Sequence, residues 1–474
     1  MRDSAENTYT REHISHWNGL ADSNHFRLAK YYHKRIEEVF KFIVAPNQKV
    51  LELGCGNGDL LAALKPKVGV GVDFSEAALD VAREKYPDIS FVCGDAHTVA
   101  LEGKFDAIIL NDLLNDVWDV QALFKNIYKY CHNGTNIIIN TYSKLWQPVL
   151  GLARTVGFAK PLLQQNWLTP EDIGQILHLE GYYVVKKYSE ILLPINIPII
   201  SKFANKFLSK LVPFKYFNLT NILVAKITPE APIFSEPKVS VIVAARNEEG
   251  NIPILFSRIP QMGAGTEIVF VEGGSSDNTY KAIEAAIADN PQCNAKLFRQ
   301  TGKGKGDAVR LGFTHAEGNI LMILDADMTV SPEDLPKFYK ALADGKGDFI
   351  NGVRLVYPME GQAMRFFNLI GNKFFSLAFS WLLGQLIKDT LCGTKVLSRE
   401  NYQKIAANRS YFGDFDPFGD FDLIFGAAKQ HLKIVDLPIR YRDRIYGDTN
   451  ISRWKHGLIL LRMVFFAARK IKFI

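Results

Sequence analysis

The sequence lacks paired cysteines, an apolar leader and any uninterrupted hydrophobic run long enough to cross a membrane. Five cysteines are scattered over 474 residues without a CxxC pair, which favours free thiols and a reducing compartment. The start, MRDSAENTYTREHISHW, has no apolar stretch of the kind a secretory signal needs. The apolar run 368–387 is interrupted by Asn372, Lys373 and Gln385, so we do not expect it to span a bilayer. These absences predict a cytoplasmic protein.

Length and composition predict more than one α/β domain. Hydrophobic residues make up 47% and charged residues 22%, as in folded globular proteins, and 474 residues exceed what one hydrophobic core usually organises. The polar stretch 227–238 contains three prolines and is expected to join two domains. We predict domains at 1–228 and 238–474 with a linker at 229–237. The net charge of +6 suits phosphate-rich ligands or a membrane surface, but is weak evidence for either.

The first half alternates short β-rich runs with helical spacers, which predicts a parallel sheet covered on both faces. The turn in LELGCGNGDLL carries Gly54, Gly56 and Gly58, and glycine there permits a close approach of a ligand. Asp73 ends the next run, where a carboxylate can accept both hydroxyls of a ribose, and Asp95 ends the one after. Dinucleotide sites share this glycine spacing, but no hydride-transfer constellation accompanies it.

These motifs resemble those of the class I S-adenosylmethionine-dependent methyltransferases, over about residues 10–227. The resemblance implies a Rossmann-like sheet, S-adenosyl-L-methionine as cofactor and a lid of leading helices around Trp17. The implied cofactor-binding residues are Glu52, Gly54, Gly56, Gly58, Asp73, Asp95, Ala96 and Asn111. His97, Asp112 and Asp116 are candidates for the base that an oxygen acceptor needs. A satisfied strand-end histidine is the alternative for His97, and a helix cap is the alternative for Asp116.

In the second half, the apolar run of ILDADMTV stops at Asp325 and Asp327. Residues i and i+2 of a strand point to the same side, so the two carboxylates are predicted to converge on one Mg²⁺ or Mn²⁺ ion. The alternative is that they cap the following helix. Because SPEDL offers its own cap, Ser331 with Asp334 at the capping-box spacing, the metal site is favoured.

Neighbouring segments carry polar groups of the same kind. VAARNEEGNI contains Asn247 and Glu248, and VEGGSSDNT begins its turn after Glu272. TGKGKGDAVRLGF places Lys303 and Lys305 before a helix, an arrangement suited to a diphosphate. A solvated loop is the alternative for the two lysines.

Together these segments resemble the inverting family 2 glycosyltransferases of GT-A fold, in particular the dolichol-phosphate mannosyltransferase-like group, over about residues 237–455. The resemblance implies a nucleotide-sugar donor, a polyprenyl-phosphate or glycan acceptor and Mg²⁺ or Mn²⁺. The implied donor-binding residues are Asn247, Glu248, Glu272, Lys305, Asp325 and Arg354. Asp325 and Asp327 would hold the metal, Asp389, Asp420 and Asp422 compete as the base, and Arg442 and Arg444 would bind an acceptor phosphate. Glu272 is followed by Gly273 where the family commonly has a second acid, which leaves the nucleotide open.

Three stretches, 199–215, 366–388 and 454–474, mix apolar residues with cations. They suit a membrane interface or an ordinary core with snorkelling lysines. We predict a bifunctional transferase in surface glycan or glycolipid biosynthesis, in the cytoplasm or peripheral on the cytoplasmic membrane face. A nucleic-acid partner is not expected, because NDLLND stands where such methyltransferases carry an Asn-Pro-Pro-aromatic motif. The alternatives are a fusion with one or no active domain, or a methyltransferase for an unrelated small molecule.

Overall fold

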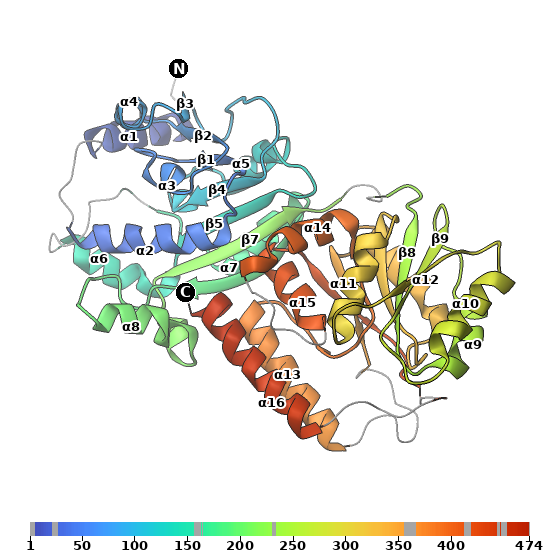
Figure 1. Cartoon of the computed structure of the whole chain (residues 1–474). Coiled ribbons are helices and arrows are strands. Elements are labelled where there is room, and N and C mark those ends of the chain that lie inside the picture. Colours follow the sequence, from blue (N-terminus) through green and yellow to red (C-terminus); the bar gives the residue numbers. More distant parts are fainter. Residues whose placement is uncertain are drawn as a thin grey trace. The chain divides into compact units, whose positions relative to one another are not determined.

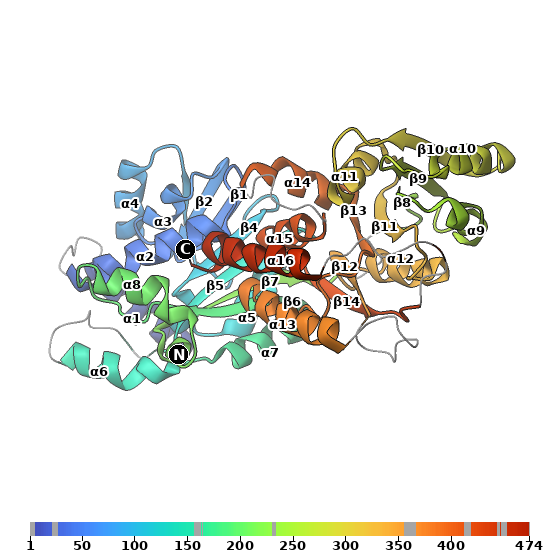
Figure 2. The same ribbon diagram turned by 60° about the horizontal axis from the view of Figure 1, so that its bottom comes forward.

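The computed structural model describes residues 5–20, 27–155, 163, 165–229, 234–354, 366–411, 419–442, 446 and 453–473. The chain forms two compact units, residues 1–228 with 473–474 and residues 229–472 (Figure 1). Each unit contains one seven-stranded sheet with helices packed on it (Figure 2). The two sheets confirm the predicted α/β class for both halves of the chain.

In the first unit the strands lie in the order β3, β2, β1, β4, β5, β7, β6. The first five are parallel, whereas β7 is antiparallel to both β5 and β6. Because β2 and β4 flank β1 on opposite sides, the sheet has its switch point between β1 and β4, the usual place for a ligand crevice. The strands are β1 (Lys49–Leu53), β2 (Val68–Asp73), β3 (Ser90–Cys93), β4 (Ala107–Asn111), β5 (Asn136–Tyr142), β6 (Tyr182–Glu190) and β7 (Thr220–Ile227).

Helices cover both faces of this sheet, because alternate residues of a strand point to opposite sides. Ile108 of β4 packs with Phe124 of α5 and Leu177 of α7, while Ile109 packs with Phe40 of α2 on the other face. The helices are α1 (Ala5–Leu20), α2 (Arg27–Ile43), α3 (Asp59–Ala63), α4 (Glu76–Lys85), α5 (Val120–Tyr128), α6 (Gln147–Thr155), α7 (Pro170–Leu179) and α8 (Ile200–Lys206).

In the second unit the strand order is β10, β9, β8, β11, β13, β12, β14. Strands β10, β9, β8 and β11 are parallel, β13 is antiparallel to β11 and β12, and β12 is parallel to β14. The strands are β8 (Val239–Ala245), β9 (Thr266–Glu272), β10 (Asn294–Arg299), β11 (Ile320–Asp325), β12 (Phe349–Val353), β13 (Lys395–Ser398) and β14 (Ile434–Pro438).

The second sheet is also covered on both faces. Val241 of β8 packs in one cluster with Phe256 of α9 and Phe338 of α12. On the other face α11 lies so close that a Cβ at Gly312 would be 2.5 Å from Ile242 Cγ2. The helices are α9 (Ile252–Arg258), α10 (Thr279–Asp289), α11 (Lys305–His315), α12 (Leu335–Ala343), α13 (Phe366–Leu383), α14 (Arg399–Ala407), α15 (Asp420–Lys429) and α16 (Arg453–Ala467).

The long helices α13 and α16 pack side by side in the second unit, as both views show. In the part of the chain that the structure describes, no helix combines the length and hydropathy needed to cross a bilayer.

Candidate active sites

The glycine turn after β1 has a backbone that only glycine adopts readily. Gly54, Gly56 and Gly58 have φ values of 72°, 49° and 74°, all in the left-handed region. A Cβ at Gly58 would lie 2.7 Å from Phe91 Cζ, and one at Gly54 would lie 2.9 Å from Leu113 Cδ1. A Cβ at Gly56 would meet nothing within 4 Å. The turn is therefore packed at its two ends and open in the middle.

Two carboxylates lie beside this turn. Asp73, at the end of β2, accepts hydrogen bonds from the backbone N–H groups of Gly56 (2.8 Å) and Ser75 (2.9 Å), and burial raises its pKa. Glu52 of β1 is only 2% exposed, and burial raises its pKa to about 8. Its Oε2 has no hydrogen-bond partner in the described structure. A buried oxygen of this kind is costly unless a ligand or water completes its bonding.

Asp95 and His97 form a closed pair after β3. Asp95 accepts hydrogen bonds from the His97 backbone N–H (2.8 Å) and ring Nδ1 (2.5 Å), and this pairing lowers the pKa of Asp95 and raises that of His97. The other ring nitrogen accepts from the Asp119 N–H at 3.2 Å. Both nitrogens of His97 are thus occupied, which matches the role of a satisfied strand-end histidine. The Ala96 carbonyl accepts from Asn126 Nδ2 at 2.9 Å.

After β4 the chain places Asp112 in a polar cluster. Asp112 has a φ of 55°, and each of its carboxylate oxygens is 3.0 Å from the Tyr32 hydroxyl that donates to it. Asn140 Nδ2 donates to Asp112 Oδ1 (2.8 Å) and to Asn111 Oδ1 (3.0 Å). Burial, reinforced by the charge of Asp116, raises the pKa of Asp112 to about 7. The cluster therefore holds a carboxylate that changes charge near neutral pH.

Asp116 lies close to the leading helix α1. Burial raises its pKa, while Gln165, which donates to it at 3.2 Å, and nearby His13 act in the opposite direction. Asn18 of α1 also contacts the turn after β2, since its Oδ1 accepts from Ser75 Oγ at 2.6 Å. Sequence reasoning missed Tyr32 and Asn140 altogether. Neither belongs to a short motif, and Tyr32 is separated from Asp112 by 80 positions.

In the second unit, the ends of β8 and β9 are joined by polar contacts. Asn247, with a φ of 57°, accepts from the Ser276 N–H (2.8 Å) and donates its own N–H to Ser275 Oγ (3.0 Å). Glu272 Oε1 accepts from the Ser275 N–H at 2.5 Å. Glu248 is 7% exposed and accepts from Asn251 Nδ2 at 2.6 Å. The predicted nucleoside-binding residues thus lie at the adjacent ends of β8 and β9.

A second cluster surrounds the end of β11. Lys305 Nζ, at the start of α11, forms an ion pair with Asp325 Oδ1. Although burial acts to raise it, the pKa of Asp325 is lowered by Lys305, Lys395 and Arg354. There is no room for a Cβ at Gly393, because it would overlap Asp325 and Lys305. Four chain segments therefore meet at this carboxylate.

Asp327 lies outside the strand, since β11 ends at Asp325. Its Oδ1 accepts from the Thr329 N–H (3.1 Å) and Oγ1 (2.8 Å) in a tight turn, so the strand alternation used to predict the metal pair does not apply. The predicted cap at Ser331 is also wrong, because its side chain makes no capping hydrogen bond. Instead, Ser331 Oγ donates to Glu333 and accepts from Arg258 at 3.1 Å.

The three candidate bases have different surroundings. Asp389 is fully buried and receives three hydrogen bonds from Arg354, two from the guanidinium (2.8 and 2.9 Å) and one from the backbone N–H (3.1 Å). Asp420 Oδ1 is 3.0 Å from Lys395 Nζ, and the charge of Asp420 acts on Lys305 as well. Asp422 instead pairs with Arg409 at 2.9 Å. Residues two apart on a helix point to nearly opposite sides, so α15 brings Asp420, and not Asp422, to the Asp325 cluster.

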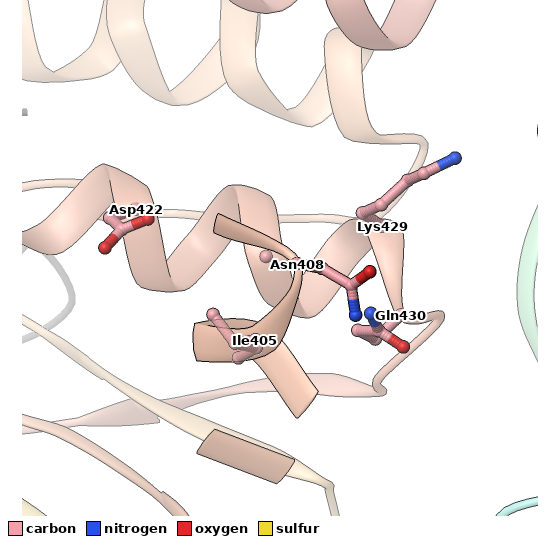
Figure 3. Close-up of a pocket in the computed structure, with 6 residues that line it drawn as sticks. Ile405, Asn408, Asp422, Lys429 and Gln430 are labelled. Carbon is pink, nitrogen blue, oxygen red and sulfur yellow. The ribbon is translucent and has the colours of Figure 1, made fainter. Parts of the chain in front are cut away.

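Asp422 lies at a separate small pocket on α15 (Figure 3), whose lining residues are Ile405, Asn408, Asp422, Gly426, Lys429 and Gln430. Arg442 is exposed, and its backbone N–H donates to the Thr329 carbonyl at 3.0 Å, next to the Asp327 turn. Arg444 lies outside the described residues. Within the described residues there is no group of three or more His, Cys, Asp or Glu side chains arranged to hold a metal.

Comparisons with known proteins agree with this division. Residues 50–134 match the model of the methyltransferase domain family, and residues 240–405 match that of glycosyl transferase family 2. The chain therefore carries a methyltransferase domain followed by a family 2 glycosyltransferase domain. Both predicted enzyme classes are confirmed at this level, as is the predicted pairing of a Rossmann-like with a GT-A unit.

Curated relatives are named as glycosyltransferases. The chain is 29% identical over 224 residues to the glycosyltransferase AglJ of Haloferax volcanii (47% of this chain, 69% of the relative). It is 30% identical over 221 residues to the dolichol-phosphate mannosyltransferase of Pyrococcus furiosus (45% and 59%). An undecaprenyl-phosphate 4-deoxy-4-formamido-L-arabinose transferase of Shewanella sediminis is 32% identical over 111 residues (23% and 34%). The chain thus spans between about a third and about two thirds of the length of these relatives.

Solved structures match each half of the chain at low identity. A magnesium protoporphyrin IX methyltransferase of Synechocystis has 17% identity and a TM-score of 0.34, covering 47% of this chain and 98% of its own. A glucosyl-3-phosphoglycerate synthase of Mycobacterium tuberculosis has 18% identity and a TM-score of 0.37, covering 50% and 80%.

Proposed function

We propose that the chain is a bifunctional transferase. Its second unit transfers a sugar from a nucleotide-sugar to a polyprenyl phosphate, with inversion at the anomeric carbon, and its first unit transfers a methyl group from S-adenosyl-L-methionine. The observation that carries the proposal is the cluster of Lys305, Asp325, Lys395 and Asp420 at the end of β11. Relatives named as transferases to dolichol phosphate and undecaprenyl phosphate support this acceptor class.

The donor is proposed to lie across the ends of β8, β9 and β11. Asn247, Glu248 and Glu272 would contact the nucleoside, and Lys305 would contact the diphosphate. Arg354 would also lie near the phosphates, although two N–H groups of its guanidinium already donate to Asp389. Cationic groups placed here stabilise the negative charge that develops on the departing nucleoside diphosphate.

The carboxylates of Asp325 and Asp327 fit a Mg²⁺ or Mn²⁺ ion in their chemistry, since hard oxygen ligands suit both ions. Asp325 is held in its charged form by its cationic neighbours. Because the described residues offer no third acidic or histidine ligand, the remaining ligands would come from the diphosphate and water. Such an ion would supply further charge neutralisation to the leaving group.

A phosphate acceptor is ionised at neutral pH and needs no base. Arg442, exposed beside the Asp327 turn, is proposed to contact the acceptor phosphate, and Arg444 stays a sequence-based proposal for the same role. For a hydroxyl acceptor, Asp420 is the proposed base. Asp389 is already held by the Arg354 guanidinium, and Asp422 pairs with Arg409 on the other side of α15.

In the first unit, the unpartnered Glu52 Oε2 and the open space over Gly56 support a cofactor site at the glycine turn. Glu52 and Gly54 to Gly58 would flank the methionine part, Asp73 the ribose, Asp95 and Ala96 the adenine, and Asn111 the sulfonium end. Asp112 is the proposed base for the methyl acceptor, because its pKa of about 7 allows proton uptake near neutral pH.

The deciding experiment is a nucleotide-sugar screen with purified protein, a short polyprenyl phosphate and Mn²⁺ or Mg²⁺, followed by nucleoside-diphosphate release. We expect release with one nucleotide-sugar, dependent on acceptor and metal. Asp327→Ala is expected to abolish release and to leave S-adenosyl-L-methionine binding, measured by calorimetry, unchanged. Normal transfer by this variant would refute the metal assignment, and acceptor-independent turnover would refute the acceptor class. Because a polyprenyl phosphate resides in a bilayer, we propose a peripheral position at the cytoplasmic membrane face.

A further inference from the structure

The segment between β6 and β7 contains a helix that buries polar side chains and exposes apolar ones. Helix α8 buries Ser201 and Asn205, each 1% exposed, while Ile200 and Phe203 are 56% and 55% exposed. Its preceding residue, Ile199, is 85% exposed with a φ of 65°. A β-branched residue rarely adopts this backbone, so the chain holds an apolar side chain in solvent at a conformational cost.

The exposed apolar residues of the described chain are concentrated in this segment. Of 26 large hydrophobic side chains that are exposed, 11 lie between residues 195 and 217. We call residues 195–217 the apolar insert. Its exposed members are Ile195, Ile197, Ile199, Ile200, Phe203, Phe207, Leu211, Val212, Phe214, Tyr216 and Phe217. Exposed apolar side chains gathered in one segment indicate a binding surface.

The charge of the segment has one sign. No Asp or Glu occurs from residue 191 to residue 229, whereas five lysines do, and Lys202, Lys206 and Lys215 lie within the insert outside the buried core. Lys215 Nζ is 4.9 Å from the Tyr216 ring centroid. Aromatic and aliphatic side chains interleaved with lysine match the chemistry of a bilayer with anionic headgroups.

The insert is held in shape by its buried polar residues. Asn205 accepts from the Leu193 N–H (2.8 Å) and donates to the Leu193 carbonyl (2.7 Å). Ser201 Oγ donates to the Ile195 carbonyl at 2.6 Å. Lys210 forms a buried ion pair with Glu190, at the end of β6. The apolar surface is therefore presented by an ordered scaffold of the methyltransferase unit, beside α2 (Figure 1).

We propose that the apolar insert docks the methyltransferase unit onto an anionic phospholipid surface. The commitment to lipid follows from the charge of the segment, because a membrane with acidic headgroups complements a lysine-bearing segment that contains no Asp or Glu. The inference deepens the proposed function, from which it takes only the membrane setting. It assigns the anchoring contact to the methyltransferase unit, and would keep this unit at the surface that holds a lipid-linked sugar.

The test measures membrane binding of two double variants of the full chain by flotation. The vesicles are phosphatidylcholine, with or without about 30% phosphatidylglycerol as the anionic lipid. Ile200→Glu/Phe203→Glu alters the insert. Val68→Glu/Leu179→Glu makes the same change at two exposed positions elsewhere in this unit, which are 44% and 71% exposed. We expect the wild type and the control to float with anionic vesicles, and the insert variant to bind at least about tenfold more weakly.

Sugar transfer in detergent solution to a short polyprenyl phosphate, and S-adenosyl-L-methionine binding, are measured in parallel. Both should be equal in the two variants, so a failure of the proposed chemistry is distinguished from a failure of docking. Binding of the insert variant within twofold of the wild type would overturn the proposal, as would absence of wild-type binding. A concentration-dependent dimer of the wild type that the insert variant loses, seen by sedimentation velocity without vesicle binding, would assign the surface to a second copy instead.

Discussion

Replacing Gly56 and Gly58 of the same turn, one at a time, should distinguish effects on ligand binding from effects on stability. Gly56→Ala and Gly58→Ala add the same methyl group, and both positions have a positive φ. The left-handed backbone alone costs about 1–2 kcal/mol for an L-residue. At Gly58 the new Cβ would also lie 2.7 Å from Phe91 Cζ, and overpacking typically adds about 1–3 kcal/mol. We therefore expect a loss of about 2–5 kcal/mol for Gly58→Ala and about 1–2 kcal/mol for Gly56→Ala.

The loss of cofactor affinity should follow the opposite order: among folded molecules, Gly56→Ala should lose more affinity than Gly58→Ala. The Cβ at Gly56 would enter space where no atom beyond its chain neighbours lies within 4 Å, so it would occupy the volume that we assign to S-adenosyl-L-methionine. Urea unfolding followed by tryptophan fluorescence reports mainly on the methyltransferase unit, because four of the six tryptophans precede residue 228. Calorimetry then gives the affinity. Wild-type affinity in Gly56→Ala would refute the placement of the cofactor over this turn.

Three further predictions concern the charged clusters. Because the pKa of Asp112 is raised to about 7, its contribution to stability is fully present below pH ~4 and is lost as pH rises to ~7, and Asp112→Asn should remove this pH dependence of stability. The rate of methyl transfer should rise over the upper part of that range. A flat pH–rate profile would count against Asp112 as the base. Gly393→Ala should reduce sugar transfer at least about tenfold with unchanged cofactor binding, because its Cβ would displace the side-chain ends of Asp325 and Lys305. Transfer rates like those of the wild type would contradict this. Lys395→Met should destabilise the second unit by about 3–5 kcal/mol, since it leaves Asp420 without its paired lysine. Urea unfolding should show that the double variant Lys395→Met/Asp420→Asn recovers part of this stability. A double variant no more stable than the single one would exclude the ion pair as the cause.

The parts of the sites that could be predicted from sequence are those encoded locally. Gly54, Gly56 and Gly58 directly follow a strand, and all three have the positive φ values that glycine adopts without a Cβ penalty. Asp73 and Asp325 each end a strand, and the carboxyl ends of parallel strands meet at one sheet edge. A short window of sequence contains all of this information.

The parts that could not be predicted depend on distant contacts or on helix phase. The bond from Tyr32 to Asp112 joins two elements 80 positions apart. The choice between Asp420 and Asp422 depends on which side of α15 faces Lys395, and the start of that helix is not marked by a side-chain cap. At Ser331 a plausible capping box was overridden by Arg258, 73 positions away, because a charged partner outcompetes a backbone N–H for the hydroxyl.

Helix α2 has a mechanical consequence for the first unit. Its residue Tyr31 accepts a hydrogen bond from Asn205 of the apolar insert at 3.2 Å, and the next residue, Tyr32, donates to Asp112. A helix turns as a stiff rod over this length, so a rotation of α2 would stretch both bonds at once. A displacement of α2 would therefore move the hydroxyl that contacts the insert together with the hydroxyl that donates to Asp112.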